Sequence, residues 1–180
     1  MKHMLAILVM SFMSAAYATP YVASEYETNE NRVTKADSIG AAVIVGKKYD
    51  SGLQVSGKVN YSQAELGSGS ITNSVEGRVK QSFGAFYLGG RLGERITQTN
   101  HFSYYAIDTG VVVPVVNAFS VDFSYRYRNA FSNGMNFETN RYGVEGKVKL
   151  TKNDTLGLRY SQSYGDSETN GWRLQYTHSF

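Results

Sequence analysis

Residues 119–128 read FSVDFSYRYR, and every second side chain among them is apolar. The apolar set is Phe119, Val121, Phe123, Tyr125 and Tyr127, and the intervening set is Ser120, Asp122, Ser124, Arg126 and Arg128. A period of two residues is typical of a β-strand whose two faces meet different surroundings. The stretch therefore predicts a strand with one apolar face and one charged face.

The same alternation recurs along the chain after residue 20, where helical periodicity is scarce. Ten segments show it, at 20–28, 37–48, 52–62, 71–81, 83–96, 103–114, 119–128, 139–150, 155–164 and 171–180. Most are about 9–12 residues long, whereas strands of soluble proteins average about 5–6 residues and tilted membrane strands need about 9–11. Their length favours strands that cross a bilayer.

Short and long connectors alternate between these segments. The short ones are 49–51, 81–83, 115–118 and 151–154, and the long ones, rich in Asn, Ser, Gly and acidic residues, are 29–36, 62–70, 97–102, 129–138 and 165–170. Outer-membrane barrels have short periplasmic turns and longer outer loops. We therefore expect an all-β fold, a closed antiparallel up-and-down transmembrane β-barrel of about ten strands with both termini periplasmic. Eight or twelve strands remain alternatives, and a soluble lipocalin-like barrel would need an apolar interior.

Composition agrees with a β-rich protein. The 180 residues include 18 Gly and 14 Tyr but only 2 Pro and no Cys, which excludes disulfides and thiolate metal sites. Charged residues make up 18%, below the ~25% of a soluble domain. The mean hydropathy of −0.33 argues against a bundle of membrane helices. No His/Asp/Glu cluster has metal-ligand spacing, so no metal and no cofactor is expected.

The first 18 residues predict a secretory signal peptide. Lys2 and His3 precede an apolar run that is too short to span a bilayer, and Ala16-Tyr17-Ala18 has the small-x-small form of a cleavage site. A short N-terminal core helix is the alternative. We expect residues 19–180 to form the barrel, with 17 Lys and Arg against 15 Asp and Glu after cleavage. That small excess does not argue for a nucleic-acid partner.

The chain ends with alternating residues at Trp172, Leu174, Tyr176, His178 and Phe180. This ending resembles the C-terminal assembly signal of bacterial outer-membrane β-barrels. The resemblance implies a place in the outer membrane, in contact with its lipid and lipopolysaccharide, and insertion by the barrel-assembly machinery, with Trp172, Leu174, Tyr176 and Phe180 as the signal. Short loops and an Arg-rich polar face are also weakly similar to the narrow porins that pass acidic oligosaccharides.

The polar face of the strands carries an excess of positive charge. Near mid-barrel we place six cations, Lys58, Arg78, Arg91, Arg126, Lys147 and Arg159, against three acids, Glu76, Asp108 and Glu145. An unpaired buried charge costs several kcal/mol, so a dry interior could not hold this excess. These nine residues therefore predict a wet, narrow, anion-preferring pore for small or acidic solutes. The alternative is a non-conducting structural or adhesion barrel whose interior is filled by salt bridges.

Signals for an enzyme are weak, and we expect none. His101-Phe102-Ser103 has the His-x-Ser spacing that some lipid-modifying barrels use at their outer rim, with Ser as nucleophile and His as base. An ordinary polar loop explains the same residues. A lipid-modifying enzyme that uses His101 and Ser103 is thus a remote alternative.

Overall fold

The structure is a computed structural model that describes residues 18–64, 69–132, 134–135 and 137–180. Most of the predicted signal peptide and parts of two predicted loops, 62–70 and 129–138, lie outside the described residues. These described residues form ten strands: β1 (Ala18–Asn31), β2 (Asp37–Tyr49), β3 (Leu53–Ala64), β4 (Ile71–Phe83), β5 (Phe86–Thr97), β6 (His101–Val116), β7 (Phe119–Ala130), β8 (Thr139–Lys149), β9 (Asp154–Gly165) and β10 (Thr169–Ser179). No helix in the described ranges is long and apolar enough to cross a membrane.

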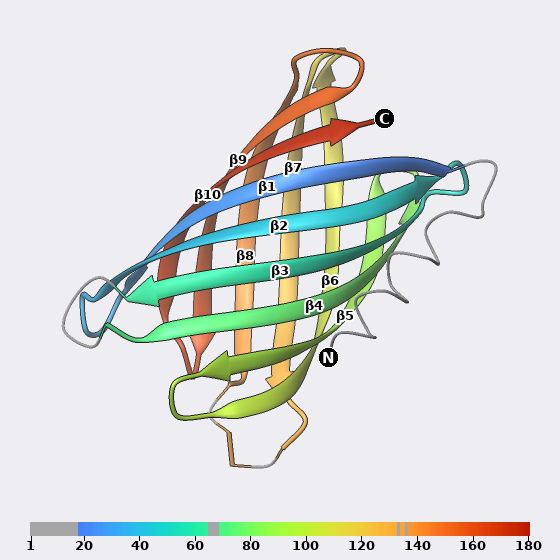
Figure 1. Cartoon of the computed structure of the whole chain (residues 1–180). Helices are drawn as coiled ribbons and strands as arrows, with labels where there is room; N and C mark the ends of the chain where they lie inside the picture. The colour runs from blue at the N-terminus through green and yellow to red at the C-terminus, as the bar shows by residue number, and fades with distance from the viewer. Residues whose placement is uncertain (1–17, 65–68, 133, 136) are drawn as a thin grey trace.

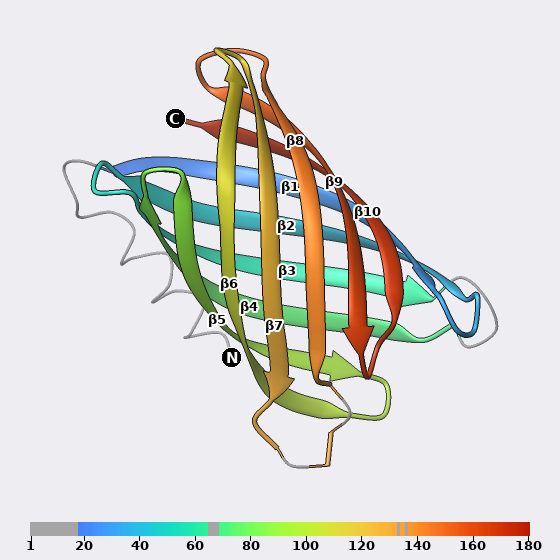
Figure 2. The same ribbon diagram turned by 180° about the vertical axis from the view of Figure 1, so that it is seen from behind.

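The strands form one closed barrel in which each strand pairs with its neighbours in sequence (Figure 1). The ring closes because β1 pairs antiparallel with β10, from Tyr21 opposite Ser179 to Asn31 opposite Thr169. The view from behind shows the same continuous wall (Figure 2). The predicted closed, antiparallel, ten-stranded barrel is therefore confirmed.

The two faces of the wall have opposite character. Every strand places large apolar side chains on the outside, among them Val22, Val43, Val59, Val75, Leu92, Ile107, Phe123, Val144, Leu158 and Leu174. Charged side chains such as Glu25, Asp122 and Glu145 are instead buried inside. A soluble barrel needs the reverse arrangement, because its outer wall meets water. Apolar outside and polar inside is the arrangement of a barrel whose wall faces lipid.

Aromatic rings gather on the outside of β6 to β10, in the half nearer the long loops. Tyr125 and Tyr142 have ring centroids 5.2 Å apart, and the rings of Tyr160 and Trp172 are 5.0 Å apart. Amide side chains bind the phenol groups here, as where the Tyr125 hydroxyl contacts Asn140 Oδ1 at 2.7 Å. Rings with a polar tip suit the boundary between lipid and water.

Several predicted boundaries are wrong. The long loops expected at 97–102 and 165–170 shorten to 98–100 and 166–168, because the flanking strands extend into them and His101 lies on β6. The turn expected at 81–83 lies at Gly84-Ala85 instead, because Gly84 adopts a φ of 62° that favours glycine and closes a tight hairpin. The turn expected at 115–118 shrinks to two residues, because β6 continues to Val116 through a register shift between Pro114 and Val116. Proline has no N–H to donate to the ladder, so a bulge is where a strand tolerates it.

The two ends of the described barrel wall lie together on the side of the short turns (Figure 1). The backbone N–H of Phe180 donates to the carbonyl of Pro20 at 3.0 Å. On the outside, Asp154 accepts hydrogen bonds from the hydroxyls of Thr151 at 2.5 Å and Tyr176 at 2.6 Å, and it lies 2.8 Å from His178 Nδ1. The last strand is therefore held at its end by the β8–β9 turn as well as by β1.

Candidate functional site in the lumen

Inward glycines make room for large side chains inside the barrel. A Cβ on Gly93 would lie 2.6 Å from the ring of Tyr104, and a Cβ on Gly157 would lie 2.6 Å from Glu145 Oε1. Neither position could carry another residue unless these side chains moved. The small residues of one strand thus allow ionisable and aromatic groups of other strands to lie across the lumen.

One chain of ion pairs crosses β4, β5, β6 and β7. Arg91 lies between two carboxylates, since its Nη1 is 2.9 Å from Glu76 Oε1 and its Nε binds Asp108. Glu76 also binds Arg78, and Asp108 also binds Arg126 Nε at 2.7 Å. These two acids therefore satisfy three of the cations that we placed near mid-barrel.

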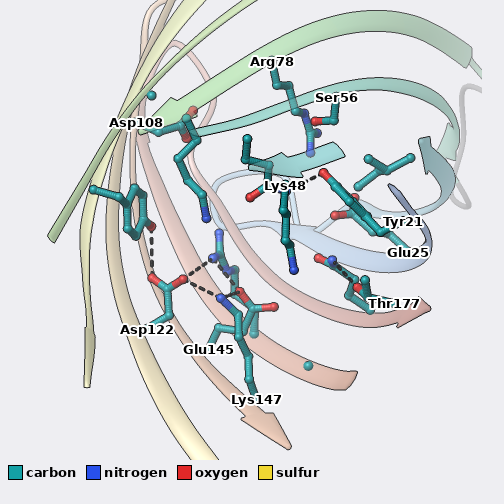
Figure 3. A pocket seen from close by; sticks show the side chains of 18 of the residues that line it. Tyr21, Glu25, Lys48, Ser56, Arg78, Asp108, Asp122, Glu145, Lys147 and Thr177 are labelled. Atoms are coloured by element: carbon teal, nitrogen blue, oxygen red, sulfur yellow. Dashed lines mark hydrogen bonds and ion pairs between the residues drawn. The ribbon is translucent and has the colours of Figure 1, made fainter. Parts of the chain in front are cut away.

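A second chain of ion pairs surrounds Glu145 on β8. Its Oε2 lies 2.6 Å from Arg159 Nη2, 3.4 Å from Arg173 Nη2 and 3.6 Å from Lys147 Nζ. Asp122 on β7 accepts from Lys147 at 2.7 Å, and from a phenol group as well (Figure 3). The carboxylates of Glu145 and Asp122 thus share their cations.

Glu25 extends the second chain across the line where the barrel closes. It binds Lys58 on β3, and its Oε1 lies 3.2 Å from Arg173 Nη1 on β10. Nearer the long loops, Glu27 holds Arg141 at 3.0 Å. We refer to the two chains together, without Glu27 and Arg141, as the ion-pair belt: Glu25, Lys58, Glu76, Arg78, Arg91, Asp108, Asp122, Arg126, Glu145, Lys147, Arg159 and Arg173.

The ion pairs of the belt contradict our prediction that six cations near mid-barrel outnumber the acids that could pair with them. All six cations placed near mid-barrel have carboxylate partners, because Glu25 and Asp122 join the three acids that we placed there. The tilt of the strands causes the difference. Asp122 is close to the start of β7 in sequence, yet it lies directly opposite Glu145 in the register of β7 and β8. A long loop, from Ala130 to Thr139, joins the two strands, so the order of residues in the sequence does not fix this register.

Four further cations have no carboxylate within ion-pair distance among the described residues, and each lies against an aromatic ring. Toward the short turns, Lys48 Nζ is 5.3 Å from the ring centre of Tyr21, and Lys80 Nζ is 4.8 Å from that of Tyr87. Toward the long loops, the guanidinium groups of Arg95 and Arg128 lie 5.2 and 4.0 Å from the ring centre of Phe137. Positive charge without a matching acid thus flanks the belt on both sides.

Two cavities occupy the lumen, and Arg78 and Arg91 line both of them. The turn-side cavity has a volume of about 230 Å³, and its lining includes Arg159, Lys147, Asp108 and Glu145 (Figure 3). The loop-side cavity has a volume of about 210 Å³, and its lining includes Lys58, Arg126 and Glu76. All nine residues that we expected inside the barrel therefore line one of these cavities. Each cavity is large enough for several water molecules.

The His-x-Ser pair does not belong to the lumen. His101 and Ser103 are exposed on β6, and the imidazole lies 3.5 Å from the carboxylate of Glu94 on β5. Within the described ranges, no group of three or more His, Cys, Asp and Glu side chains could hold a metal ion.

Comparison with known proteins shows similarity in structure only. No family model and no curated protein matches the sequence. An outer membrane channel from Pseudomonas putida F1 superposes with a TM-score of 0.54 at 7% identity, over 93% of this chain and 97% of that chain. The translocator domain of the autotransporter NalP from Neisseria meningitidis gives 0.53 at 9% identity, over 99% and 94%. The β domain of the Bordetella autotransporter BrkA gives 0.51 at 14% identity, over 91% and 99%. The fold of this chain is that of an outer-membrane β-barrel.

Proposed function

We propose that the protein is a narrow outer-membrane pore that prefers small anions, with the ion-pair belt as its constriction. The observation that carries this proposal is a set of four cations, Lys48 and Lys80 on one side of the belt and Arg95 and Arg128 on the other. None of the four pairs with a carboxylate in the part of the chain that the structure describes. In a narrow, low-dielectric lumen such charges concentrate anions at both entrances and repel cations.

The lining of the loop-side cavity favours the passage of acidic solutes that also carry hydroxyl groups. Its lining divides by strand. Strands β1 to β4 contribute mainly neutral polar groups, including Asn29, Ser38, Asn60, Ser62, Thr72 and Ser74, and β5 to β8 contribute Arg91, Arg95, Arg126, Arg128 and Arg141. Guanidinium groups bind carboxylates or phosphates with two parallel hydrogen bonds, and the neutral wall offers partners for hydroxyl groups.

The belt itself favours a second candidate, a barrel that does not conduct and serves a structural or adhesive role. Two chains of paired charges cross the lumen, and Glu145 and Asp122 are both 2% exposed. An ion must displace these pairs to pass. Uncovering a buried charge costs several kcal/mol unless water or the passing ion replaces its partner.

We also propose that the barrel lies in the outer membrane and is inserted there by the barrel-assembly machinery. Trp172, Leu174, Tyr176 and Phe180 are between 42% and 70% exposed on the outer face of the last strand. Such a row of apolar side chains is available to lipid, including lipopolysaccharide, and to the barrel-assembly machinery before the barrel closes. Their exposure supports the assembly-signal interpretation.

Planar-bilayer recording of the purified protein separates the two candidates. We expect small single-channel conductance and a reversal potential on the anion side in a salt gradient. Replacing both Arg95 and Arg128 with Gln should move the reversal potential toward zero, whereas the control Lys35→Gln, a change in an exposed loop residue, should not. A folded parent that gives no conductance would establish the filled barrel, and a cation-selective parent would contradict both the anion preference and its explanation.

A further inference from the structure

The turn-side cavity holds more positive than negative charge. The described residues that line it include seven cations and four acids, which leaves an excess of three positive charges. Lys48 and Lys80 contribute to this excess, since neither has a carboxylate within ion-pair distance in the described part of the chain. A narrow cavity with surplus charge of one sign concentrates ions of the opposite sign. This cavity therefore favours an anion.

A series of contacts joins Lys80 to Lys147 across the cavity wall. Lys80 Nζ lies 4.8 Å from the ring centre of Tyr87, and the Tyr87 hydroxyl donates to Asp122 Oδ1 at 3.0 Å. The other oxygen of that carboxylate accepts from Lys147 Nζ at 2.7 Å. The ammonium groups of Lys80 and Lys147 are therefore linked through one phenol and one carboxylate.

Lys48 reaches the same cavity from another part of the wall. It lies on β2 with its side chain exposed, and its Nζ is 5.3 Å from the ring centre of Tyr21. Figure 3 shows Lys48 and Lys147 extending into the cavity from different strands. Lys147 is close enough to repel both Lys48 and Lys80. An anion placed among the three ammonium groups would relieve this repulsion.

The cavity also offers a hydrogen-bond acceptor. Three cations contact Oε2 of Glu145, whereas no described residue donates a hydrogen bond to its Oε1. This oxygen lies over Gly157, where a Cβ would approach it to 2.6 Å, and both residues line the cavity. A carboxylate oxygen with an available lone pair accepts from an O–H group. Positive donors and a negative acceptor thus occur together.

We propose that the turn-side cavity is a binding site for inorganic phosphate. Near neutral pH this anion carries negative charge on several oxygens and keeps at least one O–H group. Its charged oxygens suit Lys48, Lys80 and Lys147, because an ammonium group binds phosphate as a compact point charge. Its O–H group donates to Glu145 Oε1.

The same arrangement disfavours other small anions. Sulfate has no O–H group near neutral pH, so one of its oxygens would face Glu145 Oε1 as a second acceptor. Two facing acceptors leave both without a donor and repel each other, and specificity often depends on such a mismatch. Chloride has a single charge and no donor for Glu145. The site should therefore prefer phosphate to both.

The phosphate site deepens the proposed pore, and its part in transport rests on that proposal. Binding alone does not, because Lys48 is exposed beside the short turns and phosphate reaches it from this side without crossing the ion-pair belt. A barrel that does not conduct can still bind phosphate, and a conducting barrel can fail to bind it. Binding and reversal potential therefore test the two proposals separately.

Isothermal titration calorimetry of the purified barrel in detergent micelles and chloride buffer tests the site. The parent should bind phosphate, and it should bind sulfate at least about ten-fold more weakly. Replacing both Lys48 and Lys80 with Gln should weaken phosphate binding by about 100-fold, or about ten-fold for each charge-assisted hydrogen bond. The control Lys152→Gln changes an exposed lysine of the β8–β9 turn outside the cavity lining, and it should match the parent.

The comparison of phosphate with sulfate uses the parent alone, so it holds even where a variant fails to fold. Sulfate that binds as tightly as phosphate would overturn the proposal, and so would a folded parent that binds neither. Parental affinity in the folded Lys48→Gln, Lys80→Gln protein would overturn it as well. A loss in Arg95→Gln, Arg128→Gln as large as in the lysine pair would place the anion in the loop-side cavity instead.

Discussion

Replacing Glu145 with Gln tests how the ion-pair belt contributes to the barrel. Glu145 has 3% of its side chain exposed and lies within 3.6 Å of three cations, Arg159, Arg173 and Lys147. Removing one partner of a buried ion pair costs about 3–5 kcal/mol. Each of the three cations keeps a second carboxylate, because Asp122 still reaches Arg159 and Lys147 and Glu25 still reaches Arg173. We therefore expect the lower end, about 3 kcal/mol.

Equilibrium unfolding in urea with lipid vesicles measures this cost directly. A loss of about 3 kcal/mol lowers the ratio of folded to unfolded protein by about 100-fold, since every 1.4 kcal/mol is a factor of ten. Glu138→Gln, a change of the same chemistry at an exposed loop position, should leave the free energy of unfolding nearly unchanged. If Glu145→Gln costs less than about 1 kcal/mol and matches this control, water already screens the belt and the structural role assigned to it is wrong.

The same variant reports on conduction. If the belt is the constriction of an anion pore, the loss of a negative charge there should shift the reversal potential of Glu145→Gln further to the anion side. A shift toward cations would contradict the assigned position of the belt on the ion path.

Deletion of Phe180 should reduce the level of the protein in the outer membrane several-fold. It should lower the free energy of unfolding little, because the backbone N–H of Phe180 makes a hydrogen bond to Pro20 that is worth about 1 kcal/mol. Unchanged levels in the membrane would refute the assembly role. Val144→Arg should destabilise the barrel by about 2–4 kcal/mol, because the side chain at this position faces lipid. It should cost more than Gly143→Arg, whose side chain enters the lumen. If urea unfolding ranks the two variants in the reverse order, the two faces of β8 are misassigned. Asp154→Ala should speed amide exchange at the end of β10, since Tyr176 loses its hydroxyl acceptor; unchanged exchange would show that this contact does not hold the strand.

The sequence predicts the wall of the barrel well because alternation is a local property. Val144 and Glu145 are neighbours that differ in polarity, and each lies on the face that its polarity predicts. Turn boundaries are less predictable where backbone conformation decides them, as at Gly84, whose positive φ leaves no mark in the alternation of the flanking strands.

Pairing inside the lumen depends on relations between strands that sequence order conceals. Glu25 and Arg173 are far apart in the chain, and they meet because β1 and β10 close the ring, with Glu25 opposite Gln175. Three of the carboxylates that hold inward cations, Glu25, Glu27 and Asp122, were therefore absent from our mid-barrel set. The position of Glu94 is also hidden in the sequence, because only the register of β5 with β6 places it opposite Ser103 and beside His101.

The contact of Arg173 with both Glu25 and Glu145 has a consequence for how this protein can change over evolutionary time. These contacts hold β1, β10 and β8 at fixed distances across the interior. Duplication of a hairpin would enlarge the circumference of the barrel and separate these three side chains. Their inward charges would then be left unpaired. The ion-pair belt therefore constrains the number of strands in the barrel. A descendant with twelve strands would have to replace its inward charges together, whereas its loops could lengthen freely.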